Sequence, residues 1–363
     1  MFRVEFFVLL LAAGLASSAE LPERIKQRNE KYGSELEQYF RDYLVTQYPE
    51  RAATRWHRSY TSTEAFLESV EPNRQHYLRI FSPPDLKPIG PLDRKAVSIP
   101  GVRAEWLTLP LGFINAEALL VIPENATKPV PLIIAQHGID SFPERVFGVN
   151  DDGNLYHDYG HALVSAGFAV LAPINLSLVP DRNRIERLAR LADTTLPGIE
   201  FRRMQLILDD VLKDKRIDKD RIGMWGISLG GMATMFWMPL EPRIKCGIVT
   251  AWFNERRNKM VIPDPRYSCF LETKEEHAFF RGWLTEFTDS DVVSLICPRP
   301  LLVQTGKKDG IAWWPQVIEE FNAAKEHYRK LGLPDRIELD LHDGGHEIRV
   351  ESGLPFLERW LMQ

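Results

Sequence analysis

From residue 130 onward, short apolar runs alternate with amphipathic segments, and this alternation limits the chain to few folds. The apolar runs are typical of strands buried on both faces, and the segments between them repeat apolar residues at helical spacing. Such alternation predicts an α/β fold, with a mostly parallel central sheet and helices on both faces. We expect strands at 132–136, 168–172, 221–225, 244–250, 301–305 and 337–341, and helices at 199–213, from 229, at 314–330 and at 354–361.

The region before this alternation is different in character. Residues 103–109 and 116–122 are predicted to form two antiparallel strands joined by a turn. Residues 20–94 are predicted to form a helical N-terminal extension, which leaves residues 95–363 as the main domain. In the extension, Leu36, Tyr39 and Phe40 recur at helical spacing in a helix that Pro49 closes, and a second helix is expected to end before Pro72.

The first nineteen residues have the pattern of a cleavable secretory signal. An apolar run of ten residues from Phe6 to Leu15 precedes small residues that end at Ala19. The run is shorter than the roughly 20 residues of a membrane-spanning helix, so we expect no stable membrane anchor. Export to the periplasm or the medium is the prediction, and an ordinary N-terminal helix of a cytosolic protein is the alternative, because Glu5 offsets Arg3.

Charge and cysteine content exclude further classes. With 45 Lys and Arg against 50 Asp and Glu, the net charge is −5, so nucleic acid is not an expected partner. Three cysteines allow at most one disulfide bond, and a bridge between Cys269 and Cys297 stays open. Cys246 falls in an apolar run and is expected to be buried. The sequence leaves the oligomeric state open.

The strongest chemical signal is a Gly-x-Ser-x-Gly motif at residues 226–230. The motif lies between an expected strand and an expected helix, the context of a nucleophile elbow. Glycines at both ends permit the tight turn that exposes the Ser228 hydroxyl above the carboxyl edge of the sheet. Ser228 is therefore the candidate nucleophile.

A serine nucleophile needs a base and a carboxylate that orients the base. Asp309 and His346 both follow expected strands, at the sheet edge where α/β proteins place their ligands. His342 is the alternative base, and Glu255, soon after the strand at 244–250, is the alternative acid. Asp289 and Asp291 are interpreted as a helix cap and a solvated charge.

These motifs resemble those of the α/β-hydrolases, and among them the acetyl xylan esterase and dienelactone hydrolase-like bacterial esterases. The matching residues are His-Gly-Ile at 137–139, the elbow at 226–230, Pro-Arg-Pro-Leu-Leu at 298–302 before Asp309, and Gly-His-Glu at 345–347. The resemblance implies that Ser228 attacks a carbonyl carbon, His346 transfers the proton and Asp309 orients the imidazole. It also implies an oxyanion hole made of the backbone N–H groups of Ile139 and Leu229.

Aromatic residues after the expected strands are candidates for a substrate pocket, and Trp252 and Trp313 are those we select. Arg256 and Arg257 could bind an acidic group, although a solvated surface role is the more ordinary interpretation. His157 and His161 have the i, i+4 spacing of a metal-binding helix, but no third ligand is evident. We interpret them as exposed residues of a first helical turn, and expect neither a metal nor a cofactor.

The predicted function is a serine carboxylic ester hydrolase that forms an acyl-enzyme, with the small acyl esters of carbohydrates as the implied substrates. A serine peptidase of the prolyl-oligopeptidase type has the same order of nucleophile, acid and base. However, residues 20–94 are too few for the propeller that such peptidases usually carry. A non-catalytic binding protein on a hydrolase scaffold is the other alternative, and it would not need the three residues Ser228, Asp309 and His346.

Overall fold

The structure, a computed structural model, describes residues 23–362, whose contacts separate into two compact units with a boundary after Pro49. The shorter unit contains α2 (Glu23–Arg41), the π-helical η1 (Asp42–Thr46) and the first residues of α3 (Tyr48–Arg55). The expected signal, residues 1–19, lies outside the described residues. Among the described residues, no helix has the length and apolar character needed to cross a membrane.

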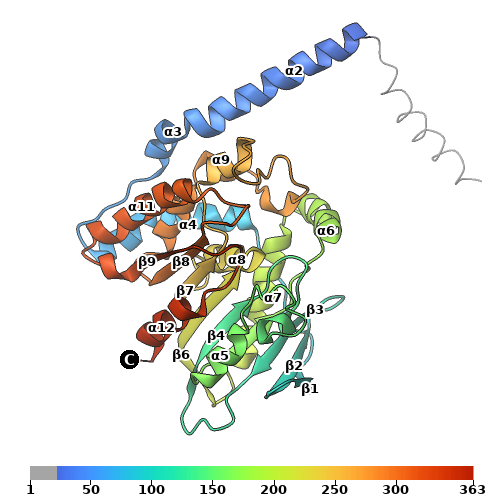
Figure 1. Cartoon of the computed structure of the whole chain (residues 1–363), viewed down its shortest axis with the longest axis vertical. Coiled ribbons are helices and arrows are strands. Elements are labelled where there is room, and N and C mark those ends of the chain that lie inside the picture. The colour runs from blue at the N-terminus through green and yellow to red at the C-terminus, as the bar shows by residue number, and fades with distance from the viewer. Residues whose placement is uncertain (1–22, 363) are drawn as a thin grey trace, which may run out of the picture. The chain divides into compact units, whose positions relative to one another are not determined.

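In the larger unit, the described residues form one nine-stranded sheet with the order β1-β2-β3-β5-β4-β6-β7-β8-β9 (Figure 1). Strands β5, β4, β6, β7, β8 and β9 are parallel to one another. Strand β3 is antiparallel to β5, and β2 and β1 extend the sheet with antiparallel pairings of β2 to β3 and of β1 to β2. This sheet confirms the predicted α/β fold. The strands are β1 (Asp93–Ile99), β2 (Val102–Pro110), β3 (Asn115–Val121), β4 (Val130–Gln136), β5 (Ala169–Pro173), β6 (Ile217–Ile227), β7 (Ile244–Thr250), β8 (Leu301–Gly306) and β9 (Ile337–His342).

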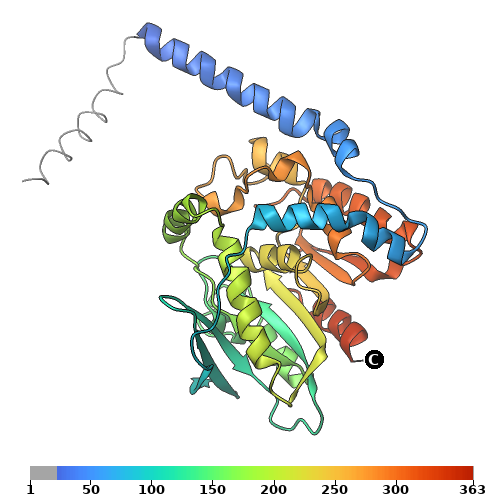
Figure 2. The ribbon, with the colours of Figure 1, turned by 180° about the vertical axis from the view of Figure 1, so that it is seen from behind.

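Helices cover both faces of the sheet, as the alternation predicted. On one face, α5 (Tyr159–Ser165) and α12 (Val350–Leu361) lie in front of the strands in Figure 1. On the other face, α7 (Leu196–Val211) and α8 (Leu229–Trp237) are seen in Figure 2. The remaining α-helices of this unit are α4 (Thr63–Phe81), α6 (Val179–Leu191), α9 (Arg256–Val261), α10 (Asp289–Ile296) and α11 (Trp314–Lys330).

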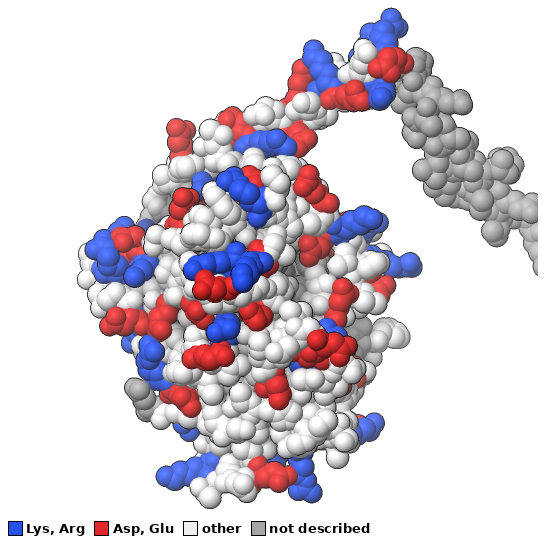
Figure 3. Space-filling model, viewed as in Figure 1, with Lys and Arg blue, Asp and Glu red and all other residues white. Residues whose placement is uncertain are grey.

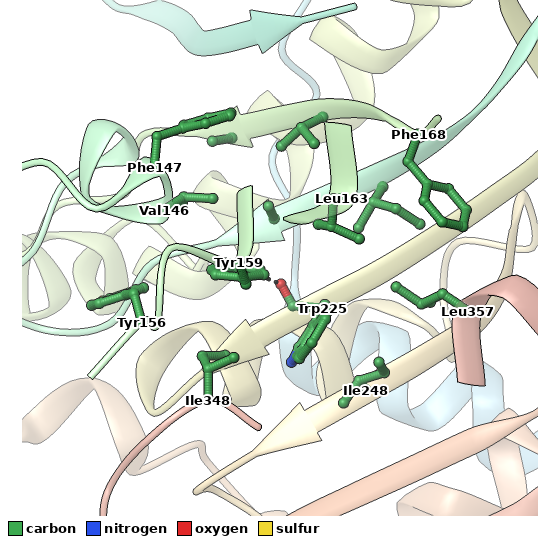
Figure 4. Packing of buried hydrophobic residues seen from close by; sticks show 14 of the residues in the cluster. Val146, Phe147, Tyr156, Tyr159, Leu163, Phe168, Trp225, Ile248, Ile348 and Leu357 are labelled. Carbon is green, nitrogen blue, oxygen red and sulfur yellow. Dashed lines mark hydrogen bonds between the residues drawn. The ribbon is translucent and has the colours of Figure 1, made fainter. Parts of the chain in front are cut away.

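The core beneath α5 and α12 centres on Trp225 of β6, which is fully buried. The Tyr159 ring packs on it with 5.0 Å between ring centroids, as Figure 4 shows. Helix α12 contacts the same ring at Gly353, where an added Cβ would lie 2.2 Å from a ring carbon of Trp225. Burial of this apolar face fixes β6, and with it the turn that follows β6.

The prediction that a helix ends before Pro72 was wrong, because α4 continues through Pro72 to Phe81. Phe66 and Val70 before the proline, and Tyr77 and Phe81 after it, are all fully buried. Pro72 has no N–H to donate to the carbonyl of Glu68, and both residues are exposed, so water can solvate this carbonyl. Helix α4 lies inside the larger unit, and the domain boundary at residue 94 stays a prediction.

Charged side chains of both signs are interspersed over the face drawn in Figure 3. This distribution agrees with the small net charge of −5.

Candidate active site

Ser228 lies between β6 and α8 in a strained backbone conformation, with φ of 58° and ψ of −119°. Three close approaches by glycines build this turn. A Cβ added at Gly226 would lie 2.2 Å from the carbonyl oxygen of Gly230. A Cβ at Gly230 would lie 2.1 Å from the carbonyl oxygen of Gln136, and one at Gly231 would lie 2.5 Å from that of Thr250. Only glycine fits at these positions, so the sequence motif forms the sharp strand-to-helix turn of a nucleophile elbow.

The loop after β4 lies beside this serine. An added Cβ on Gly138 would be 3.4 Å from the Cβ of Ser228, which places the segment from Gly138 to Ile139 against the candidate nucleophile. The hydroxyl of Tyr156 accepts the Gly138 N–H at 2.8 Å. Leu229, the other proposed oxyanion donor, is the first residue of α8, whose N-terminal N–H groups favour negative charge.

His137 stabilises the same loop through hydrogen bonds. Burial lowers the pKa of His137 to about 4, so its imidazole is neutral at neutral pH. Its Nε2 accepts the N–H of Asn175 at 3.1 Å, and its Nδ1 therefore donates to the carbonyl oxygen of Gly138 at 2.9 Å. We assign His137 a structural role in holding this loop.

Asp309 and His346 are brought together by two loops at the carboxyl edge of the sheet. The Oδ2 of Asp309 lies 2.9 Å from the Nδ1 of His346, and the Asp309 side chain is 2% exposed against 29% for His346. Backbone hydrogen bonds join the two loops: Lys307 N–H donates to His342 O at 2.9 Å and Lys308 N–H to Gly344 O at 3.0 Å. The pairing across 37 residues has the geometry of an acid that orients a base.

Ser228 and Asp309 both line one small cavity of about 70 Å³. Among the described residues, the structure shows no hydrogen bond between the Ser228 hydroxyl and the His346 imidazole, so the serine arm of the triad stays a prediction. The other lining residues come from the ends of β7 and β8, from α9 and from the segment that follows α9: Ala251, Trp252, Phe253, Asn254, Arg256, Lys259, Ser268, Phe270, Glu275, Thr305, Ile311 and Ala312.

The alternative acid and base have other contacts. Glu255 is the N-cap of α9, where its carboxylate accepts the Asn258 N–H at 2.7 Å. The Nδ1 of His342 accepts the Gly344 N–H at 3.2 Å. These contacts favour Asp309 and His346 for the catalytic pair.

The solvated-surface interpretations of Asp291 and Arg256 were wrong, because both are buried. Asp289, interpreted as a helix cap, is the buried first residue of α10, and Thr288 is the N-cap. Arg256 donates two hydrogen bonds to Asp289, at 2.8 and 2.7 Å, and Asp291 pairs with Arg58 at 2.5 Å. Buried charges require such partners, and sequence spacing alone did not indicate a partner 33 residues away. Arg256 also donates to the carbonyl oxygen of Trp252 at 3.1 Å, so this ion pair holds the loop that follows β7.

Lys259 is a buried cation in the cavity wall that the sequence did not reveal. Its ammonium donates to the hydroxyl of Ser268 at 2.7 Å and to the carbonyl oxygen of Ile311 at 2.6 Å. Burial lowers the pKa of Lys259 to about 8, and burial raises the pKa of Glu275 in the same wall. Lys259 thus joins the segment after α9 to the loop that carries Asp309.

The structure separates the two selected tryptophans. Trp252 lines the cavity, and the guanidinium of Arg256 lies 4.5 Å from its ring centroid. Trp313 is the N-cap of α11 and is not among the residues of the cavity wall; its ring stacks with Arg266 at 3.7 Å. Trp252 is therefore the better placed of the two to contact a group bound next to Ser228.

His157 and His161 do not share a helix face, because α5 begins only at Tyr159 and His157 has a φ of 49°. Each has a different carboxylate partner, Glu347 for His157 and Asp158 for His161. Within residues 23–362, no cluster of three His, Cys, Asp or Glu side chains is arranged to hold a metal ion. Cys246, Cys269 and Cys297 are buried free thiols, so the structure does not contain the bridge between Cys269 and Cys297.

Three features define an α/β-hydrolase: a sheet in which β5 lies between β3 and β4, a serine on a strained strand-to-helix turn, and a hydrogen-bonded aspartate and histidine in the loops after β8 and β9. The comparison with known families agrees, since residues 62–344 match the abhydrolase family Abhydrolase_7. The chain belongs to this family.

Individual relatives are distant. The chain is 24% identical to the Bacillus subtilis (strain 168) protein named "Putative hydrolase YtaP" in an alignment of 292 residues, which covers 74% of this chain and 94% of that protein. Among solved structures it is similar to one described as a putative acetyl xylan esterase from Bacteroides fragilis NCTC 9343, with a TM-score of 0.65, 20% identity, and 79% and 77% of the two chains covered. A CE15 glucuronoyl esterase from Teredinibacter turnerae T7901 has a TM-score of 0.59 at 17% identity, with 85% and 90% covered. At these identities the two structures establish the shared fold.

Proposed function

We propose that this protein is a serine carboxylic ester hydrolase that works through an acyl-enzyme. The observation that carries the proposal is the Asp309–His346 hydrogen bond of 2.9 Å, with Asp309 on the same cavity as a serine held at φ 58° on a nucleophile elbow. In the proposed reaction, the imidazole of His346 takes the hydroxyl proton of Ser228 as the oxygen attacks the ester carbonyl carbon. His346 then returns the proton to the leaving alcohol, and water repeats the sequence to release the acid.

The negative charge of the tetrahedral intermediate would develop beside Gly138 and the start of α8. We propose that the backbone N–H groups of Ile139 and Leu229 stabilise this charge, each by roughly 3 to 4 kcal/mol in comparable hydrolases. The glycine contacts that fix the elbow support this role, because preorganised donors need no reorientation during the reaction.

We further propose short-chain acyl esters of carbohydrates as substrates. The cavity next to Ser228 has a volume of about 70 Å³, room for a group of a few non-hydrogen atoms. That size suits an acetyl group better than a long acyl chain. The carbohydrate part is supported by the similarity to structures described as acetyl xylan and glucuronoyl esterases.

The test is hydrolysis of p-nitrophenyl acetate by wild type and by Ser228→Ala, with the butyrate and octanoate esters and a peptide p-nitroanilide measured beside it. We expect acetate hydrolysis that falls by several orders of magnitude in the variant, a decline in kcat/KM with chain length, and no anilide cleavage. Full ester hydrolysis by Ser228→Ala would refute the mechanism. Anilide cleavage that depends on Ser228 would favour the peptidase alternative.

A further inference from the structure

Tyr156 and His157 are consecutive residues that contact two different loops of the candidate active site. The Tyr156 hydroxyl accepts the N–H of Gly138, in the loop proposed to hold an oxyanion donor. The Nε2 of His157 lies 2.7 Å from the Oε2 of Glu347, and Glu347 directly follows His346. One short segment therefore contacts both sides of the proposed catalytic machinery.

This segment, Asp151–His157, which we call the brace, is a tight and internally bonded turn. The carboxylate of Asp151 accepts the N–H of Leu155 at 3.0 Å and that of Tyr156 at 2.8 Å. Asn154 and His157 have φ values of 48° and 49°, in the left-handed region that non-glycine residues seldom occupy. Such a conformation persists only where surrounding contacts hold it, and it is common at active sites, where side chains need a fixed orientation.

The brace also contacts the loop that carries His346, the proposed base. Besides its contact with His157, the carboxylate of Glu347 accepts the Gly345 N–H at 3.1 Å. The next residue, Ile348, donates its N–H to the carbonyl oxygen of Leu155 at 2.8 Å. Figure 4 shows Tyr156 and Ile348 next to the same apolar core, in which both are buried.

We propose that His157 and Glu347 are positioning residues for the reaction, and this inference rests on the proposed function. The hydrogen bond to Asp309 fixes only one ring nitrogen of His346, whose side chain is 29% exposed. The contacts of Glu347 with His157 and with Gly345 anchor the main chain on both sides of His346. The brace thereby sets the position of the base relative to the oxyanion loop.

The test compares His157→Ala, Glu347→Ala and the double variant with wild type in kcat and KM for p-nitrophenyl acetate. A misplaced base impairs the chemical step, so kcat should fall on the order of 10- to 100-fold in each single variant while KM stays within about two-fold. The double variant should be no slower than the slower single variant, because both changes remove the same contact. Glu347→Gln keeps the length of the side chain and one accepting oxygen, but it replaces the other oxygen by an NH2 group, so its kcat should lie between those of wild type and Glu347→Ala.

A matched control is His76→Ala, which removes another His–Glu pair, between His76 and Glu286 at 2.6 Å. His76 lies on α4, and its side chain is 32% exposed against 30% for His157, so this variant should keep the wild-type kcat. A kcat for folded His157→Ala within two-fold of this control would overturn the inference, as would multiplying losses in the double variant. If an alanine variant does not fold, an unchanged kcat in Glu347→Asp, whose carboxylate is one methylene shorter, overturns it instead. Activity in Ser228→Ala, measured in parallel, would refute the proposed function, and the inference with it.

Discussion

Gly306 at the end of β8 lies against Gly345 at such short range that an added Cβ would be 2.1 Å from the Gly345 carbonyl oxygen. Asp309 follows Gly306 by three residues and His346 follows Gly345 directly. The close approach of these two glycines is therefore part of what sets the 2.9 Å contact between the acid and the base.

Gly306→Ala should separate these loops and lower kcat on the order of 10- to 100-fold, because displacements of about 1 Å have effects of this size. Gly310→Ala is the matched control, since nothing lies within 4 Å of a Cβ added there, in the same loop as Asp309. Steady-state kinetics of the two purified variants make the comparison. Equal kcat values would show that the glycine contact does not position the pair.

Asp309→Asn should lower kcat on the order of 10³- to 10⁴-fold, because the amide cannot stabilise the imidazolium or hold the required tautomer of His346. Glu255→Gln should keep kcat within about three-fold, since Glu255 caps α9 and Gln retains an acceptor for the Asn258 N–H. Both variants can be assayed on p-nitrophenyl acetate with active-site titration. A large loss in Glu255→Gln together with an active Asp309→Asn would exchange the roles of the two carboxylates.

Much of the fold could be predicted because short buried strands leave a strong local signal. The runs that became β4, β7, β8 and β9 are almost continuously apolar or end at a clear turn, and strand ends placed Ser228, Asp309 and His346 on one edge. Strand β1 was missed, because it is an edge strand whose residues are mostly exposed and whose first three residues are charged.

The contacts that position the site could not be predicted in the same way. Arg256 with Asp289, and His157 with Glu347, are 33 and 190 residues apart, and no local pattern encodes either pair. The helical interpretation of His157 failed because the residue adopts a left-handed backbone before α5 begins. A spacing of four residues places two side chains on one helix face only where both residues belong to a helix.

Glu320 on α11 makes the free energy of unfolding depend on pH. Burial raises the pKa of Glu320 from 4.5 to about 7, with Glu255 contributing next, although the Ser290 N–H donates to it at 2.6 Å. Between pH 4.5 and about 7 the folded protein thus binds more protons at Glu320 than the unfolded chain, so this group's contribution to stability falls as the pH rises through that window.

Glu320→Gln should remove this loss and make the variant more stable than wild type at pH 8, by on the order of 1 to 3 kcal/mol, with a smaller difference near pH 4.5. Urea unfolding at several pH values measures the effect. Glu319→Gln, one residue earlier and exposed, should change the free energy of unfolding by less than about 0.5 kcal/mol throughout. The same difference from wild type at every pH would refute the assignment to Glu320.

Gly353 in α12 is the position where a helix-favouring substitution should destabilise the protein. An alanine normally stabilises a helix by about 1 kcal/mol relative to glycine. At Gly353, however, the new Cβ would be 2.2 Å from the buried ring of Trp225, so α12 would have to move off the core. We expect Gly353→Ala to lower the free energy of unfolding by about 1 to 3 kcal/mol.

The matched change Gly33→Ala in α2, where nothing lies within 4 Å of the added Cβ, should cause no loss of stability. Urea unfolding of both variants, monitored by tryptophan fluorescence, measures the difference between their free energies of unfolding. Stabilisation by Gly353→Ala would mean that the packing of α12 on Trp225 leaves room that the structure does not show.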